Sequence, residues 1–260
     1  MQRRNFVKST VLAATALSTS VAQAASPNPI AGKNELYELR IYELKFGSPQ
    51  SNLDKYFKEA LLPALNKYGV KNVGIFTEIG KSEPAKVYLL IPYPSIEDFA
   101  TITPKVKADA DFKKAAESYT ALAVDKAPYA RFTTSLLIAF DGLPQMKATS
   151  KEARIFEIRT YEGYNEEALR RKVKMFNEGE FDIFYRTKLN PVFFGEAIAG
   201  DKMPCLTYMV TFKDMAERDA NWKNFSADPA WKTISALPEY ANSVSKITKI
   251  FLEPTSYSQI

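Results

Sequence analysis

Two short segments of the sequence contain the residue types best suited to chemistry. Each has the order glutamate, arginine, tyrosine, with one residue between successive members. A strand places alternate residues on one face, so the three side chains of each segment should lie together. A guanidinium offers a planar fork of donors to a carboxylate or enolate oxygen, and a tyrosine hydroxyl is a neutral donor. The candidate ligand-binding residues are these two triads and two further tyrosines expected to face the same space: Glu38, Arg40, Tyr42, Glu157, Arg159, Tyr161, Tyr88 and Tyr208.

The same triads also have a purely structural interpretation. An isolated charge is costly to bury, so a glutamate and an arginine on an inward face must be paired or hydrated. Either the two side chains of each triad close on one another and fix how the sheets pack, or the space they face is a polar cavity. The sequence alone does not decide between these two interpretations, because ion pairs with a purely structural role also use glutamate and arginine.

The composition excludes several classes of site. The 260 residues include no histidine and one cysteine, Cys205. A Ser-His-Asp or Cys-His nucleophile therefore cannot form, and neither can a histidine-ligated zinc, haem or iron site. A single cysteine makes no intrachain disulfide and no cysteine-rich metal site. We expect no metal and no cofactor, and any catalysis must use carboxylate, arginine, lysine, tyrosine or backbone groups.

Residues 1–24 are typical of a cleaved export signal. Arg3-Arg4, a spacer, Phe6 and Lys8 match the twin-arginine pattern, although paired arginines occur in other signals too. A short apolar stretch and the sequence Ala22-Gln23-Ala24 follow. These features predict a periplasmic or secreted protein without a stable membrane anchor. Three of the basic residues and none of the acidic ones lie in this segment, so the mature chain would be nearly neutral and nucleic acid is not an expected partner.

The rest of the sequence is a duplication. Residues 35–43 align with residues 154–162 at an offset of 119, and Asp109 aligns with Asp228 at the same offset. Tyr88 matches Tyr208 at an offset of 120. The pattern predicts two homologous domains, 33–141 and 153–260, joined by a linker at 142–152 that is rich in turn-forming and polar residues.

Each half has the same predicted order of elements, β-α-β-β-α-β, which is the ferredoxin-like arrangement. Ser95 and Asp214 are expected to cap the second helix of each half, and Pro63 should kink or restart the first helix. The predicted fold class is α+β, with two tandem ferredoxin-like domains that pair their antiparallel sheets into an α+β barrel.

The alternation along the first strand of each half predicts which face is buried where. The more apolar face, with Tyr37, Leu39 and Ile41, is expected to lie against the helices, and the face with the triad to look into the space between the sheets. In the second half Trp222, Phe225 and Trp231 follow near-helical spacing, which favours ordinary core packing.

Residues 37–42 (YELRIY), their copy at 156–161 (FEIRTY) and the element Asp228-Pro229-Ala230-Trp231 resemble the NIPSNAP family of the dimeric α+β-barrel superfamily. The first half departs from the last element, with Ala110 and Phe112 in place of proline and tryptophan. The resemblance implies ferredoxin-like sheets paired into a barrel and no settled activity. Superfamily relatives include cofactor-free oxygenases, dehalogenating and lyase-like enzymes and haem-binding proteins, and those with a histidine ligand cannot be models for this chain.

Three functions are therefore consistent with the sequence. The first is binding of a small organic molecule between the two sheets. The second is a cofactor-independent oxygenase, isomerase or lyase, in which an arginine stabilises an oxyanion and Glu38 or Glu157, with a raised pKa, is the base. The third is a structural or interaction module with a filled barrel, and a filled lumen would remove the first two. The duplicated chain can be a monomer with an internal pseudo-dimer or a homodimer.

Overall fold

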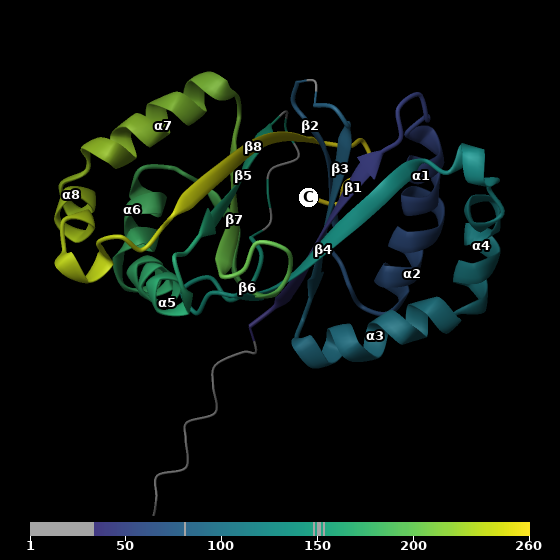
Figure 1. Ribbon diagram of the computed structural model, residues 1–260, viewed down its shortest axis with the longest axis horizontal. Helices are drawn as coiled ribbons and strands as arrows, with labels where there is room; N and C mark the ends of the chain where they lie inside the picture. Colours follow the sequence, from purple (N-terminus) through teal and green to yellow (C-terminus); the bar gives the residue numbers. More distant parts are fainter. Residues whose placement is uncertain (1–33, 81, 148, 150–151, 153) are drawn as a thin grey trace, which may run out of the picture. The chain divides into compact units, whose positions relative to one another are not determined.

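The computed structural model describes residues 34–80, 82–147, 149, 152 and 154–260, and the export signal expected at 1–24 lies outside them. Within the compact unit Gly32–Ile260, the same order of elements occurs twice (Figure 1). The first copy contains β1 (Leu36–Leu44), α1 (Ser51–Tyr56), α2 (Leu62–Lys67), β2 (Gly74–Glu78), β3 (Lys86–Tyr93), α3 (Ile96–Ala108), α4 (Ala110–Thr120) and β4 (Tyr129–Ala139). The second contains β5 (Ile155–Glu162), α5 (Glu166–Met175), α6 (Phe181–Arg186), β6 (Pro191–Ala199), β7 (Cys205–Phe212), α7 (Met215–Ala227), α8 (Pro229–Ser235) and β8 (Lys246–Pro254).

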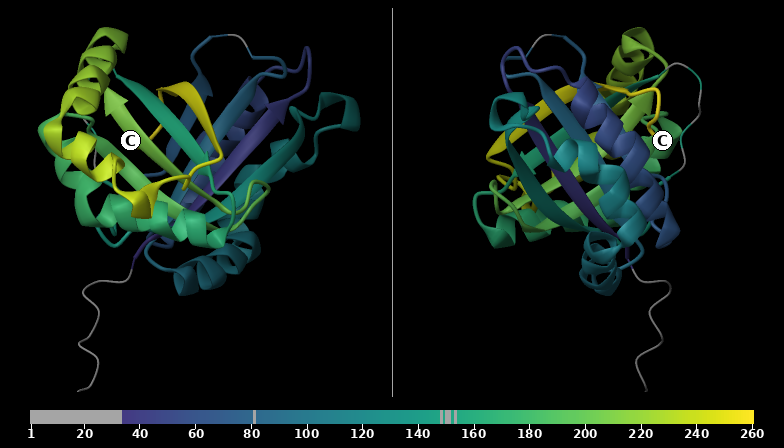
Figure 2. Two further views of the ribbon diagram at one scale, coloured as in Figure 1. Left: turned by 60° about the vertical axis from the view of Figure 1, so that its left-hand side comes forward. Right: turned by 90° about the vertical axis from the view of Figure 1, so that its right-hand side faces the viewer.

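The strands close into one antiparallel barrel in the order β1-β3-β2-β8-β5-β7-β6-β4. The two copies join where β2 pairs with β8 and where β4 pairs with β6. Helices α1–α4 cover the strands of the first copy and α5–α8 those of the second, so the strands run between two helical flanks (Figure 2). The predicted α+β barrel of two ferredoxin-like halves is confirmed.

The helices of the two copies share local features, of which the caps were predicted from the sequence. A π-helical turn, Phe57–Leu61, separates α1 from α2, and Pro63 lies in the first turn of α2, so the chain stays helical through the proline. The equivalent π-helical turn of the second copy is Phe176–Glu180. Ser95 Oγ accepts from the amide of Asp98, and Asp214 Oδ1 accepts from the amide of Glu217, so both expected caps are present.

The barrel lumen is filled with apolar side chains from all eight strands. Tyr37 and Leu39 of β1 point into it together with Phe156 and Ile158 of β5, and the packed cluster also contains Phe76, Leu90, Leu137, Ala139, Val192, Phe193, Ala197, Cys205, Met209 and Leu252. This corrects the predicted orientation of β1 and β5, because their apolar faces look into the lumen and the triads look towards the helices. Side chains thus occupy the space between the sheets in which a ligand was expected.

The correction has a physical reason. Both faces of a barrel strand are covered here, one by the opposite strands and the other by helices, so the usual contrast between a buried and a solvated face is missing. The lumen is closed by strands on all sides and is occupied mainly by apolar side chains, because an unpaired charge there would be costly. The helix layer is less continuous, and a charged side chain on that face can reach a partner on a helix.

Candidate functional site

The structure brings four of the predicted residues of the second copy together on the helix-facing side of the sheet. Glu157, Arg159 and Tyr161 project from β5, and Tyr208 projects from β7 directly opposite Arg159. Glu38, Arg40 and Tyr42 occupy the same face of β1 in the first copy.

Tyr88 does not belong with these residues. It lies opposite Ile41 in the β1–β3 pairing and faces the lumen, where its hydroxyl donates to Glu78 Oε1 at 2.5 Å. The residue of the first copy that corresponds to Tyr208 is Leu89, opposite Arg40. The match at an offset of 120 was therefore one residue out of register, and a slip of one residue moves a strand side chain to the other face.

Glu157 is the anchor of the second-copy site. Its side chain is fully buried and accepts four hydrogen bonds. Oε1 accepts from Arg159 Nε at 2.7 Å and from Arg218 Nη2 at 3.1 Å, and Oε2 accepts from Arg218 Nε and from Trp222 Nε1, both at 2.9 Å. Burial alone would raise the pKa of this carboxyl, but the hydrogen bonds from Arg218, Arg159 and Trp222 outweigh it and the pKa is lowered. Glu157 is therefore a carboxylate that holds cations, which does not fit the predicted role of a base.

Arg159 is held on one side and open on another. Its guanidinium carbon lies 3.7 Å from the centre of the Trp222 ring, a close cation–π stack. Its Nη1 atom is 3.4 Å from the hydroxyl of Tyr161, and that hydroxyl shares a 2.9 Å hydrogen bond with the hydroxyl of Tyr208. No described residue accepts a hydrogen bond from Nη2. Since Arg159 lines a cavity, this edge of its guanidinium is available to an oxygen there.

The cavity has a volume of about 460 Å³, within the range of small-molecule sites. It lies between the sheet of the second copy and helices α5–α8. One side is polar, with the arginine and the two tyrosine hydroxyls. The other side is aromatic: Phe184 of α6, Trp222 and Phe225 of α7 and Trp231 of α8 contact one another at ring-centre distances of 4.5–6.0 Å. The tryptophans predicted as ordinary core packing thus form a cavity wall.

A buried ion pair, which the sequence did not reveal, lines the same cavity. Lys172 of α5 donates to Glu180, the last residue of the π-helical turn, and both side chains are almost completely buried. The ammonium also lies 4.4 Å from the ring centre of Phe176. Burial raises the pKa of Glu180, and the charge of Lys172 opposes that rise. Glu180 in turn lies close enough to Tyr208 to raise the pKa of that buried phenol, after the larger effect of burial.

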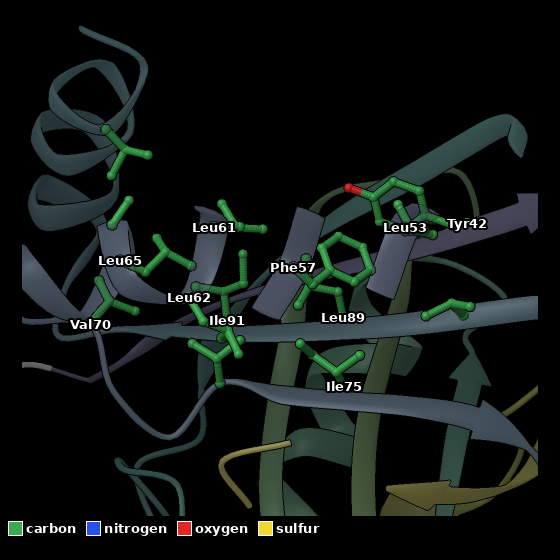
Figure 3. Close-up of a cluster of buried hydrophobic side chains, with 14 of the residues drawn as sticks. Tyr42, Leu53, Phe57, Leu61, Leu62, Leu65, Val70, Ile75, Leu89 and Ile91 are labelled. Carbon is green, nitrogen blue, oxygen red and sulfur yellow. The ribbon is translucent and has the colours of Figure 1, made fainter. Parts of the chain in front are cut away.

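The same positions of the first copy are apolar. Leu53, Leu61, Leu89 and Phe99 stand where the second copy has Lys172, Glu180, Tyr208 and Arg218, each at an offset of 119. Leu53, Phe57, Leu61 and Leu65 pack onto strand residues such as Leu89 and Ile91 in a continuous core (Figure 3). Arg40 there forms a two-bond pair with Glu38 at 2.6 and 2.9 Å, and Tyr42 is enclosed by the rings of Phe57, Tyr129 and Phe132.

The copies share a backbone and differ in what fills the space between sheet and helices. Aligning them at the helix positions would have exposed the contrast, because a lysine and a glutamate replace two leucines in an otherwise amphipathic helix. Within the described residues, no three His, Cys, Asp or Glu side chains are grouped as a metal site. None of the described helices has both the length and the apolar character needed to cross a membrane.

An antiparallel eight-stranded barrel flanked by two sets of helices defines an α+β-barrel protein with two ferredoxin-like halves. The chain belongs to the NIPSNAP family, whose model matches residues 37–129 and 156–259, one match in each copy. No curated protein sequence matches this chain.

Solved structures share the fold at low sequence identity. The chain is similar to a "putative monooxygenase" from Fusobacterium nucleatum (10% identity, 85% of this chain and 93% of that one, TM-score 0.55). A second protein of the same description, from Lactobacillus acidophilus, has 9% identity over 85% of this chain and 94% of that one, with a TM-score of 0.58. A NIPSNAP-like domain protein from Burkholderia xenovorans has 16% identity and covers 41% of this chain and 90% of its own length, with a TM-score of 0.38.

Proposed function

We propose that this protein binds a small, planar organic anion in the cavity between the sheet and the helices of its second copy. The contrast between the copies is the observation that carries the proposal. The first copy has leucine or phenylalanine at the positions of Lys172, Glu180 and Arg218, so the fold does not need charges at these positions. Burying Lys172 and Glu180 is costly, and a ligand site in this cavity would account for their presence.

The chemistry of the lining favours an anion with an aromatic or otherwise flat body. Three cations line the cavity: Arg159, Lys172 and Arg218. Two carboxylates oppose them, Glu180 in the lining and Glu157 behind the arginines, so cations outnumber carboxylates there. The open edge of Arg159 and the Tyr161 hydroxyl suit a carboxylate, enolate or phenolate oxygen. The aromatic wall suits the face of a flat ligand, where ring contacts add to the gain from burial.

Intrinsic fluorescence offers a direct test. The chain has two tryptophans, Trp222 and Trp231, and both line the cavity. Phenylpyruvate is a suitable probe because it joins a carboxylate to a benzyl group. We expect it to change the tryptophan emission saturably, with binding heat measured in parallel by calorimetry. Its methyl ester, which lacks the charge, should bind at least about 10-fold more weakly, the effect of one lost charge-assisted hydrogen bond.

The duplication supplies a matched pair of variants. Arg159→Met removes the anion partner and should weaken phenylpyruvate binding by about 10- to 100-fold. Arg40→Met removes the equivalent arginine of the first copy and should leave binding unchanged. If wild type shows no saturable signal, or if both variants lose binding equally, the proposal is wrong and the alternative of a structural or interaction module is favoured.

Export remains part of the proposal. The twin-arginine pattern at Arg3-Arg4 and the Ala22-Gln23-Ala24 sequence support cleavage after residue 24 and a periplasmic or secreted protein. Mass spectrometry of the N-terminus of the protein recovered from cells tests this directly. A chain that retains residues 1–24 in the cytoplasmic fraction would contradict it.

A further inference from the structure

The Lys172–Glu180 pair adds a buried carboxylate to the cavity in which Arg159 would hold the anion. The pair contributes no net charge, and two leucines replace it in the first copy. It lies in the wall of the same cavity as Arg159, Tyr161 and Tyr208. Removal of a proton from a carbon next to a carbonyl group needs two parts: a base, and a cationic site that binds the carbonyl oxygen. A carboxylate and an arginine that face one cavity supply both.

We propose that the second-copy cavity catalyses reversible proton transfer at the carbon next to a carbonyl group, with Glu180 as the base and Arg159 and Tyr161 as the oxyanion site. This inference rests on the proposed function, since the substrate class is a subset of its ligands: enolisable aromatic 2-oxo acids and related carbonyl compounds. Glu157, saturated by four hydrogen bonds, is the support of the oxyanion site and takes no proton.

The step balances without any co-reactant. Glu180 takes the proton, the C–H electron pair becomes a C=C bond, and the carbonyl π pair moves onto oxygen as an enolate. Arg159 Nη2 and the Tyr161 hydroxyl stabilise that charge, and the Tyr208 hydroxyl supports Tyr161 through their 2.9 Å hydrogen bond. Glu180 then returns the proton to carbon, or the enolate oxygen takes it to give the enol. Lys172 takes no part in the proton transfer and acts as a positioning residue for Glu180.

The burial of Glu180 suits this role. Its side chain is 3% exposed, so its carboxylate has few competing water contacts. The raised pKa that burial causes brings it nearer to the operating range of a general base than a solvated glutamate.

Deuterium exchange measures the proposed step separately from binding. Full-length protein is incubated with saturating phenylpyruvate in D₂O, and loss of the benzylic CH₂ signal is followed by proton NMR against a protein-free sample. We expect wild type to accelerate exchange by about 100-fold or more, the usual contribution of a positioned general base. Glu180→Gln should lose most of that acceleration while binding, measured by tryptophan fluorescence, stays within about 3-fold of wild type.

A second variant guards against misfolding of the first. Lys172→Leu combined with Glu180→Leu copies the residues that the first copy already accommodates at these positions, so it should fold and still bind phenylpyruvate through Arg159. It should exchange at the protein-free rate, and Arg40→Met should exchange as wild type does. Binding by wild type without accelerated exchange, or unchanged exchange in both Glu180 variants, would overturn the inference and leave the binding proposal intact. Absence of binding would overturn both.

Discussion

Leu61 and Glu180 are the last residues of the same π-helical turn in the two copies of one fold, and one is a core residue while the other is half of a buried ion pair. Both residues end equivalent secondary-structure elements, so the two copies differ here in their side chains and not in their backbone fold. The first copy therefore serves as an internal control for the second. It shows which residues the fold accepts at these positions, and the second copy has charged residues there, around a cavity.

The first prediction concerns the energetics of that ion pair. Lys172→Leu or Glu180→Leu alone leaves one buried charge without its partner and should destabilise the protein by about 3–5 kcal/mol. The double substitution should restore stability to wild type or exceed it by about 1–4 kcal/mol, because burial of the pair costs more than apolar packing. Urea unfolding of wild type, the two single variants and the double variant gives the free energies of this double-mutant cycle. If the double variant is as unstable as the worse single variant, the pair supports the fold and the argument from the first copy is wrong.

The second prediction concerns the carboxylate that holds the arginines. Glu157→Gln leaves Arg159 and Arg218 without their buried counter-charge and should cost about 3–5 kcal/mol of unfolding free energy. Glu38→Gln is the matched change, and it should cost less because one cation, Arg40, depends on that carboxylate. Denaturant unfolding compares the two.

The same two variants should also differ in their affinity for phenylpyruvate. Glu157→Gln weakens the hydrogen bonds that fix Arg159 and Trp222, so phenylpyruvate affinity should fall, whereas Glu38→Gln should bind as wild type does. Equal losses of stability and unchanged affinity in both would show that Glu157 has no special part in the site.

Much of the fold could be predicted from the sequence because repetition and alternation are strong signals. The offset of 119 between residues 40 and 159 persists through strands and helices, and the β-α-β-β-α-β order and the caps at Ser95 and Asp214 depend on local patterns. The barrel itself follows from two half-covered sheets in one chain.

The candidate site could be predicted only in part. Strand periodicity placed Glu157, Arg159 and Tyr161 on one face, and that is observed, but it could not say which face meets the lumen, since helices and strands both bury what they cover. Lys172 and Glu180 are eight residues apart on an amphipathic segment, where charges are usually solvated. The burial of Lys172 depends on tertiary contacts with Tyr161 and Trp231, which no local pattern reports.

The third prediction is a pH dependence at the start of α8. Asp228 caps this helix through the amides of Ala230 and Trp231 and pairs with Arg186 through two bonds, and the hydrogen bonds from Arg186 first of all lower its pKa from 3.8 to about 2. A lowered folded-state pKa means that the unfolded chain takes up the proton first as pH falls. This contribution to stability is therefore complete above about pH 4 and is lost between about pH 4 and pH 2.

Asp228→Asn keeps a capping oxygen but removes the titration. Its unfolding free energy should fall less steeply between pH 4 and pH 2 than that of wild type, measured by urea unfolding at several pH values. Carbon-detected NMR should place the Asp228 carboxyl pKa at about 2. A value near 3.8 would show that the pair with Arg186 does not persist in solution.

The fourth prediction tests whether the lumen is filled. Cys205, the single cysteine of the chain, belongs to the lumen cluster and is buried, and burial raises its pKa to about 11. At pH 8 the thiolate fraction should be roughly 100-fold below that of an ordinary cysteine, and access is blocked as well. Labelling with a thiol-specific disulfide reagent should thus be at least about 100-fold slower in the native protein than in urea. Phenylpyruvate should not change the native rate, because it binds on the other side of the sheet. Fast native labelling that phenylpyruvate suppresses would return the ligand to the lumen and contradict the helix-side site.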